Sequence, residues 1–444
     1  MLDGLLKHPI FKNSFISFIG FGVTGLLGYL FQFFMSRRLS IANYGEFQSL
    51  VALLSILGVG SAALSYFVIA HASVFACHSD VEANRQFISW LRQKLSLLLI
   101  ILFFIIIALS WPLQQILHLN SLWSTIIIGV TAVLSLNTVI YISIFTGWQN
   151  FFAVNVLTVA STVAKLLAGI LIISFFPTAT AATLVLALSA AGSYLLARSW
   201  SVHKFQLNQL SISSSNASWS QQYFAHRRVA ADLGYIVIFT FLVLFMQNAD
   251  VLFVKHFASA DLAGHYGAFN LLGKIILWIN LGIISATLPL AIAHEHTGAH
   301  ATTRVRLYAY ILISLVSLTV ISLYLFIPVL LIKLSIGANY ILYAPALWLI
   351  GLMNALLSLL LLEANFAFAR RDLLVLPILG TTALVFTTGI LFSPTAIASV
   401  AKSGIIAFGL GGISLLLFNL HASHSKKEIA PVPITTPPIT GQPV

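Results

Sequence analysis

The sequence has very few charged residues. Of its 444 residues, 7% are charged and 59% are hydrophobic, whereas soluble proteins carry roughly 25% charged residues because their surfaces meet water. The mean hydropathy of +1.00 suits lipid better than water. This deficit excludes a soluble enzyme, a disordered scaffold and a secreted disulfide module. Unbroken apolar runs also argue against a membrane β-barrel, whose strands alternate. The remaining class is an all-α polytopic membrane protein.

Cysteine is almost absent, and no cleavable signal is evident. The single cysteine, Cys77, permits no internal disulfide and no cluster of thiolate metal ligands. The first apolar run, from Ser14 to Met35, is longer than a signal-peptide core. It ends at Arg37-Arg38 without a small-residue cleavage site. We therefore predict that this run is the first transmembrane helix.

Apolar runs of about 20 residues, the length that crosses a bilayer, recur along the whole chain. The sequence predicts twelve such helices. They lie near residues 14–36, 47–70, 95–117, 121–146, 152–175, 178–198, 231–254, 266–293, 307–332, 343–368, 373–392 and 398–420.

Lysine and arginine are distributed unevenly among the connections between these runs. If the N-terminus is cytoplasmic, 15 of the 22 lie in cytoplasmic segments and five in outer segments; Lys165 and Lys274 lie inside spans. Cytoplasmic loops of membrane proteins are enriched in these residues, so both termini are predicted to be cytoplasmic. The same bias explains the net charge of +11 without a nucleic-acid partner. With no cleaved signal or disulfide, we expect a bacterial inner-membrane protein.

One polar stretch divides the chain into two halves. Residues 201–230 are predicted to be a cytoplasmic linker between an N-terminal six-helix lobe, residues 1–200, and a C-terminal six-helix lobe, residues 231–421. Residues 422–444 are rich in proline and are expected to form a disordered cytoplasmic tail.

The two halves share a short motif. Tyr44-Gly45-Glu46-Phe47 follows the first helix, and Tyr266-Gly267-Ala268-Phe269 follows the seventh, 222 residues later. The same offset places Gln149-Asn150 opposite Arg371-Asp372. Six spans return the chain to its starting side, so the halves are predicted to be parallel repeats, as in alternating-access transporters. Locally, each tyrosine is interpreted as an aromatic anchor at the membrane interface.

Several segments together resemble a known family. The segments are Arg37–Phe47, Phe145–Phe151, Asp250–Lys255 and Gly264–Gly267, and the family is the polysaccharide-biosynthesis flippases of the multidrug, oligosaccharidyl-lipid and polysaccharide exporter superfamily. The resemblance covers roughly residues 10–420. It implies two six-helix lobes that form a V around a central cavity. Members of the O-antigen branch of this family move undecaprenyl-pyrophosphate-linked oligosaccharides to the outer leaflet.

Cations inside the spans are candidates for binding an anionic substrate. A charge at a helix centre costs about 2.5–3.5 kcal/mol and usually faces a cavity or a partner. Lys165 and Lys274 would suit a diphosphate group. Alternatively, Lys165 pairs with an acid from another helix and Lys274 extends to the interface. Arg37 and Arg38 either bind substrate at the exit of the cavity or sit at the outer interface.

Acids inside the spans are candidates for ion coupling. Asp250 and Glu363 could bind a proton or Na⁺, because a carboxylate in a low-dielectric site can exchange its proton as solvent access alternates. The alternative is structural pairing, of Asp250 with Lys255 or Lys274 and of Glu363 with Arg370 or Arg371.

A histidine-rich segment, His294-Glu295-His296 with His300, lacks the spacing of a His-Glu-x-x-His metal site. We interpret it as a solvated loop, and we expect neither a metal nor a cofactor.

These observations favour a flippase for lipid-linked oligosaccharides in polysaccharide, O-antigen or capsule synthesis, with membrane lipids and a polymerase or glycosyltransferase complex as partners. A cation-coupled multidrug exporter of the same superfamily is the first alternative. A membrane-embedded polymerase or glycosyltransferase is disfavoured, because the outer loops are short and hold few acids. A structural subunit of an assembly complex is a further alternative. The protein is therefore predicted not to be an enzyme.

Overall fold

The computed structural model describes residues 9–205, 227–295 and 299–424. The predicted polar linker falls mostly outside the described residues, as does the predicted tail after residue 424. Throughout the described part of the chain, the regular structure is helical. Twelve segments are long and apolar enough to cross a membrane, which confirms the predicted number of spans.

Each lobe contributes six of these spans. The first lobe consists of α2 (Pro9–Arg38), α3 (Ile41–Leu57), α4 (Val59–Cys77), α5 (Val81–Ile116), α6 (Leu122–Gly147), α7 (Phe151–Phe175) and α8 (Ala179–Phe205). The second lobe consists of α10 (Arg227–Phe257), α11 (Ala260–Glu295), α12 (Ala299–Phe326), α13 (Pro328–Leu334), the 3₁₀ helix η2 (Ala338–Ala346), α14 (Leu347–Ala369), α15 (Val375–Phe392) and α16 (Ile397–His424).

Helix ends differ from the predicted spans where local signals set them. The helix predicted at 95–117 begins at Val81, because the Asp80 side chain caps it by accepting a hydrogen bond from the backbone N–H of Ala83 at 2.8 Å. The helix predicted at 307–332 is two helices. Pro328 begins the short α13 at the first helical position, where its missing N–H costs nothing.

The internal repeat is visible in the turn that follows the fourth span of each lobe. Gln149 has φ +54° and Arg371 has φ +53°, at positions 222 residues apart. The N–H of the next residue, Asn150 or Asp372, donates to a carbonyl five residues back in both lobes. This pairing closes a helix with a left-handed residue. Ser79 and His118 close helices with the same turn, so the matching turns at Gln149 and Arg371 agree with the predicted parallel repeat but are of a common kind.

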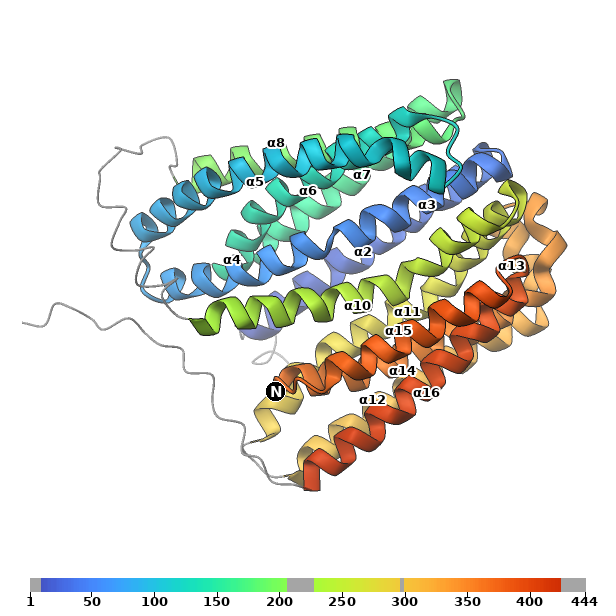
Figure 1. Ribbon diagram of the computed structural model, residues 1–444. Coiled ribbons are helices and arrows are strands. Elements are labelled where there is room, and N and C mark those ends of the chain that lie inside the picture. Colours follow the sequence, from blue (N-terminus) through green and yellow to red (C-terminus); the bar gives the residue numbers. More distant parts are fainter. Residues whose placement is uncertain (1–8, 206–226, 296–298, 425–444) are drawn as a thin grey trace, which may run out of the picture.

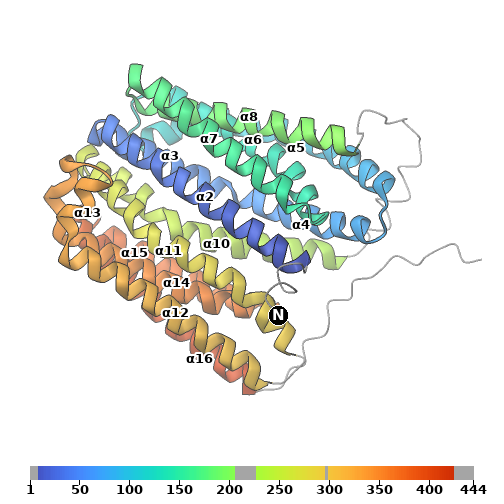
Figure 2. The same cartoon turned by 180° about the vertical axis from the view of Figure 1, so that it is seen from behind.

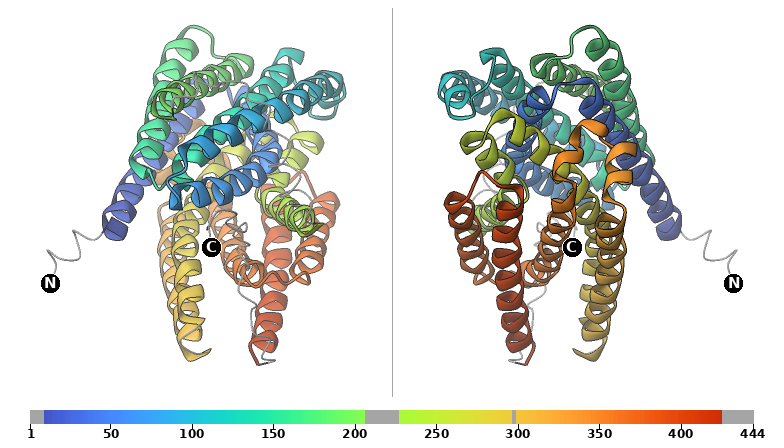
Figure 3. Two further views of the ribbon diagram at one scale, coloured as in Figure 1. Left: turned by 90° about the vertical axis from the view of Figure 1, so that its left-hand side faces the viewer. Right: turned by 90° about the vertical axis from the view of Figure 1, so that its right-hand side faces the viewer.

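The two lobes lie side by side and diverge toward one end (Figures 1 and 3). We call the end where α8 stops and α10 begins the inner end, because the lysine and arginine bias predicts that it faces the cytoplasm. The described chain begins and finishes at this same end, as an even number of spans requires (Figure 1). At the opposite, outer end the lobes come together.

Apolar side chains cover the outward surface of both lobes. Phe392 is 91% exposed and Phe326 is 79% exposed, and exposed leucines and isoleucines, up to 65% exposed at Leu97, follow along α5, α12 and α16. Soluble proteins rarely expose an apolar surface of this extent to water, whereas membrane proteins expose such a surface to lipid. The surface therefore agrees with the span count in indicating a membrane protein.

At the outer end, the two copies of the repeated motif meet across the lobe boundary. A Cβ added to Gly45 would lie 2.6 Å from the backbone N of Gly264, and one added to Gly264 would lie 2.1 Å from the carbonyl oxygen of Ile41. Only glycine permits this approach of α3 to α11. Tyr44 and Tyr266 are fully buried, so the interpretation of these tyrosines as interfacial anchors is wrong. They are buried because their helices form the contact between the lobes.

Candidate functional site

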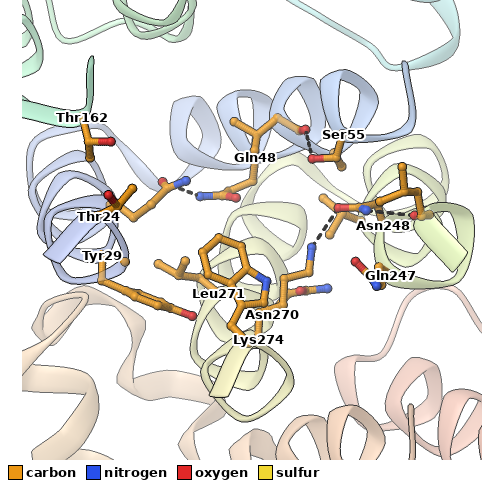
Figure 4. A pocket seen from close by; sticks show the side chains of 18 of the residues that line it. Thr24, Tyr29, Gln48, Ser55, Thr162, Gln247, Asn248, Asn270, Leu271 and Lys274 are labelled. Atoms are coloured by element: carbon orange, nitrogen blue, oxygen red, sulfur yellow. Dashed lines mark hydrogen bonds between the residues drawn. The ribbon is translucent and has the colours of Figure 1, made fainter. Parts of the chain in front are cut away.

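A cavity of about 450 Å³ lies between the lobes, with walls from α2, α3 and α7 on one side and from α10 and α11 on the other (Figure 4). Its lining is unusually rich in amide side chains for a membrane interior. These are Gln32, Gln48, Gln247, Asn248 and Asn270. No aspartate or glutamate is among the described residues that line it. The cavity therefore offers hydrogen-bond donors without negative charge.

Both intramembrane lysines line this cavity, although they come from different lobes. Lys165 lies on α7, with its Nζ 5.1 Å from the centre of the Phe31 ring. No acid lies within ion-pair distance of it among the residues that the structure describes. The suggested pairing of Lys165 with an acid from another helix is therefore not observed. A cation beside an aromatic ring remains able to bind an anion.

Lys274 enters the cavity from α11. Its Nζ donates a hydrogen bond to Oδ1 of Asn248 on α10 at 2.9 Å (Figure 4), and it interacts electrostatically with Asp250. The side chain points into the lobe boundary and is half-buried. It does not extend to the membrane interface, so this alternative for Lys274 is also not observed.

Asp250, on α10, is only 1% exposed, and no lysine among the described residues lies within ion-pair distance of it, so the expected pairing with Lys255 or Lys274 is not observed. Its Oδ2 accepts hydrogen bonds from the Tyr266 hydroxyl, at 2.6 Å, and from Nδ2 of Asn270. Asp250 itself does not line the cavity, whereas Asn270 and Lys274 do. A molecule bound in the cavity would therefore contact Asn270 and Lys274, and not the Asp250 carboxylate.

A second, apolar cavity of about 830 Å³ adjoins the first. It lies between α2, α11 and α12, on the side of the molecule seen in Figure 2. The two cavities share Phe21, Gly25, Tyr29 and Trp278 in their walls. The ring centroids of Tyr29, from the first lobe, and Trp278, from the second, are 5.6 Å apart. A molecule with a polar head and an apolar tail could occupy both cavities.

The fold matches solved structures of one kind of membrane protein. No family model matches the sequence, and no curated protein matches it. An inward-facing multidrug resistance MATE family transporter of the MOP superfamily superposes with a TM-score of 0.72, at 12% identity, over 92% of this chain and 98% of that one. The MATE multidrug transporter DinF-BH superposes with a TM-score of 0.68, at 15% identity, over 94% and 96%. The chain has the MATE fold.

An outward-facing MATE family transporter of the MOP superfamily gives a lower TM-score of 0.61, at 15% identity, over 95% of this chain and 98% of that one. At such low identities these similarities concern the fold.

Arg37 and Arg38 lie at the outer end and do not line the cavity. The Arg37 guanidinium donates hydrogen bonds to the carbonyl oxygens of Lys333, Leu334 and Ser335, where α13 ends. A cation is favourable at this negative end of a helix. Arg38 stacks over Phe34 of its own helix. We therefore do not carry these arginines forward as substrate ligands.

Glu363 is fully buried and fully engaged inside the second lobe. Arg306 binds both of its carboxylate oxygens, Tyr310 donates to Oε1 at 2.6 Å, and Asn419 donates to Oε2 at 2.6 Å. The ion-pair partner of Glu363 is Arg306, because α12 packs against α14. Arg370, one of the two expected partners, is joined to this network through Asn419, whose side chain accepts from Arg370 and donates to Glu363. Arg371 instead pairs with Asp232. A carboxylate with this many donors suits a structural tie better than ion coupling.

The predicted absence of a metal site at the histidine-rich segment concerns residues at the edge of a gap. His296 lies outside the described residues, and the side chains of the other three are not described. Elsewhere in the described chain, no group of three histidine, cysteine, aspartate or glutamate residues could hold a metal ion.

The amides of the cavity were missed in the sequence. They carry no charge, so counting charges within spans did not find them. A usable signal exists, because polar residues within apolar spans commonly face a cavity or a partner helix. Gln32, Gln48 and Asn248 each interrupt such a run.

Proposed function

We propose that this protein is a membrane transporter that moves an anionic amphiphile across the bilayer by alternating access of a cavity between its two lobes. The observation that carries the proposal is the position of the two intramembrane lysines. Lys165 and Lys274 come from opposite lobes and line the same cavity, and no described carboxylate joins them in its wall.

The chemistry of the cavity suits an anionic group. Hydrogen bonds between an ammonium and a phosphate-type oxygen are about twice as strong as neutral ones, and the neighbouring amides can donate to the remaining oxygens. A substrate held by one lysine of each lobe also draws the lobes together. Binding is thereby linked to the movement that changes access.

The adjoining apolar cavity supports an amphiphile over a simple ion. It provides apolar surface for a lipid tail while the head occupies the lysine cavity. This geometry supports our first candidate substrate, a polyprenyl-pyrophosphate-linked oligosaccharide. A polysaccharide polymerase or glycosyltransferase would then supply or consume the substrate. The connections between described outer helix ends are short, which disfavours an outer catalytic domain within the described residues.

Multidrug export is the second candidate, and the structural comparisons support it more directly. The solved structures with this fold are named as multidrug transporters, and a cavity of about 450 Å³ is of the size that holds a drug-like molecule. Drug exporters for cations need acidic residues in their cavity, however, and this cavity presents lysines. The candidate therefore applies to anionic or neutral drugs.

Asp250 is our candidate for coupling to protons. It is buried beside the cavity and interacts with a substrate lysine. Glu363 is not proposed for this role, because four donor groups already hold it in a structural network.

Reconstituted protein tests the proposal. Liposomes would contain either a fluorescent polyprenyl-pyrophosphate sugar or a cationic rhodamine dye, and transport would be followed by quenching from outside. We expect Lys165→Gln and Lys274→Gln each to reduce transport of the anionic lipid at least tenfold, because each removes a charge-assisted hydrogen bond of about 1.5–3 kcal/mol. Lys402→Gln, at an exposed position at the outer end, is the matched control and should transport normally.

Full transport of the anionic lipid by the Lys165→Gln/Lys274→Gln double variant would refute the lysine cavity. Transport of the rhodamine dye but not of the lipid would refute the preference for anions. The remaining explanation would be that the protein exports cationic drugs.

A further inference from the structure

Three polar residues of α11 form a stripe that leads from the outer contact of the lobes to the cavity. Tyr266, Asn270 and Lys274 are four residues apart, so they lie on one face of the helix. Asn248 and Asp250 of α10 face this stripe, since Asp250 accepts from Tyr266 and Asn270, and Asn248 accepts from Lys274. The five side chains form a polar cluster of two neighbouring hydrogen-bonded groups, one of Asp250 with Tyr266 and Asn270 and the other of Lys274 with Asn248.

Asp250 and Lys274 occupy different layers of this cluster. Lys274 lines the cavity, whereas Asp250 does not line it and is 1% exposed. The two groups attract each other. The other carboxylate oxygen of Asp250, Oδ1, has no hydrogen-bond partner of normal geometry among the described residues. Lys274 therefore borders the cavity, while the Asp250 carboxylate acts on it from the buried interior of the second lobe.

The first lobe has the same stripe without these charges. Subtracting the repeat offset of 222 places Tyr44 and Gln48 at the positions of Tyr266 and Asn270. Gln48 donates to the Tyr44 hydroxyl at 2.7 Å, so the polar contact along the helix is kept. The same offset places Ala52 at the position of Lys274 and Gly28 at that of Asp250. The acid and the lysine occur as a pair in the second lobe alone, which indicates a role beyond helix packing.

We propose that Asp250 is a positioning residue that makes anion binding at Lys274 depend on uptake of a proton. With one proton between them, the two side chains carry no net charge, whichever of them holds it. With two protons they carry one positive charge. An anion in the cavity is attracted to the second state, so its binding draws in a proton. This inference rests on the proposed anion-binding cavity and concerns its regulation.

Other ionisable groups near α10 lie away from this pair. On α3, Glu46 interacts with Lys255 toward the outer end, and α15 has no acidic or basic side chain. Among the side chains that the structure describes, the remaining ionisable ones of α10 and of α3, α4 and α11, which pack against it, are Asp232, Tyr235 and His256 of α10, Tyr44 of α3, Tyr66, His71 and Cys77 of α4, and Asp261 and His265 of α11. Tyr266 and Asn270 donate hydrogen bonds to Asp250, and Lys274, which lies beyond ion-pair distance, is the charged group whose field acts on it. Tyr266 remains a hydrogen-bond donor throughout.

The sign of this coupling has a consequence for transport. Linkage is reciprocal, so the proton strengthens anion binding by the factor by which the anion strengthens proton binding. The pair therefore favours states in which both are bound or both are absent. It supports movement of proton and anion in the same direction and opposes their exchange.

Calorimetry on the purified full-length protein in an uncharged detergent tests this proposal. The probe is naphthalene-2-sulfonate, whose sulfonate remains ionised while its ring can contact Trp278. Titrations in two buffers of different ionisation enthalpy give the number of protons taken up. We expect uptake approaching one proton per anion, and an affinity that falls by up to about tenfold per pH unit above neutrality.

Asp250→Asn keeps the shape and an acceptor for Tyr266 but cannot titrate. We expect it to bind the probe with less proton uptake and with a shallower pH profile than the unmodified protein. Asp261→Asn removes an exposed acid from α11, the helix that carries Lys274, and is the control, in which uptake should be unchanged. Lys274→Gln provides a second variant. Binding that remains through Lys165 should take up no proton.

Uptake of no proton by the unmodified protein, or undiminished uptake by Asp250→Asn or Lys274→Gln, would overturn the role of Asp250. In both cases probe binding that depends on the lysines would leave the proposed function intact. Binding that is unaffected in the Lys165→Gln/Lys274→Gln double variant would instead refute the proposed function.

Discussion

The outer and inner ends of the lobes are held in different ways. At the outer end, polar groups join one lobe to the other. Arg37 binds the end of α13, and Tyr340 donates to the carbonyl of Ser36 at 3.2 Å. At the inner end, polar groups join helices of the same lobe. Arg306 binds Glu363 in the second lobe, and Arg85 donates to the Phe205 carbonyl in the first.

This difference indicates how the molecule can move. Networks inside a lobe keep its helices together as a rigid unit, whereas contacts between lobes must break when access changes. In this structure the outer contacts are made and the lobes diverge at the inner end (Figure 1). The structure therefore corresponds to a state closed at the outer end. Disrupting outer contacts should change the conformation, and disrupting inner contacts should change stability.

The largest effect is expected at the inner end, for Glu363→Ala. Removing one partner of a buried ion pair leaves Arg306 unpaired and costs about 3–5 kcal/mol. We expect a large loss of thermal stability, measured by size-exclusion chromatography of heated, detergent-solubilised protein. Glu82→Ala is the control, because Glu82 is exposed and pairs with Arg85 one turn away. If both variants melt at the same temperature, the Glu363 network does not hold the lobe together.

The next effect is expected at the outer end, for Gly264→Ala. Its methyl group would overlap the carbonyl of Ile41 on the other lobe, and overpacking of this kind costs about 1–3 kcal/mol. Because the overlap exists only when the outer end is closed, we expect the population to shift toward open outer ends. Gly380→Ala, where a methyl group meets no atom within 4 Å, is the control.

Distances between spin labels would report this shift. In a protein carrying Cys77→Ser, labels at Trp123 and Leu342 span the outer ends of the two lobes, and labels at His78 and Leu373 span the inner ends. The outer distance should increase and the inner distance decrease in Gly264→Ala. Unchanged distances in that variant would show that the glycine contact does not set the conformation.

A smaller shift in the same direction is expected for Arg37→Ala. The guanidinium is exposed, and a cation at a helix C-terminus contributes about 0.3–1 kcal/mol. That corresponds to a change of about two- to fivefold in the ratio of conformations, measured with the outer pair of labels. The neighbouring Arg38→Ala should leave the distances unchanged, because Arg38 contacts its own helix. An equal effect of both variants would show that Arg37 acts through its positive charge alone and not through its hydrogen bonds to α13.

The smallest effect is expected for Arg371→Ala. Arg371 and Asp232 are 50% and 44% exposed and lie 3.0 Å apart at the inner end of the second lobe. Exposed pairs of this kind contribute about 0–1 kcal/mol. Neither the melting temperature nor the label distances should change measurably. A clear change in distance would mean that inner contacts also control the conformation.

Much of the fold was predictable from the sequence, because lipid imposes strong constraints on composition. The number of spans and the two halves followed from apolar runs and from a repeat offset of 222 residues. The positive φ of Gln149 and Arg371 agrees with that offset. Helix ends were less predictable. Caps such as Asp80 and breaks such as Pro328 are local signals that hydropathy does not include.

The site was predictable only in part. Lys165 and Lys274 were found because a charge within an apolar run is costly and therefore informative. That they line one cavity could not be known, since it depends on how α7 and α11 are placed across the lobe boundary. Glu363 was a candidate for the same reason, and Arg37 because it follows the first span at the outer side. Their partners, Arg306 and α13, lie far away in the chain.

The sequence by itself determined that the surface faces lipid, how many spans there are and that the two halves repeat. These properties depend on the order of apolar and charged residues along the chain. The tertiary structure decided which charges are free to bind a ligand. A buried charge must be neutralised or face a polar space, and its partners come from other helices. Through packing, Glu363 accepts from four donor groups and Lys165 lies beside an aromatic ring. Packing also buries Asp250 where its charge acts on Lys274.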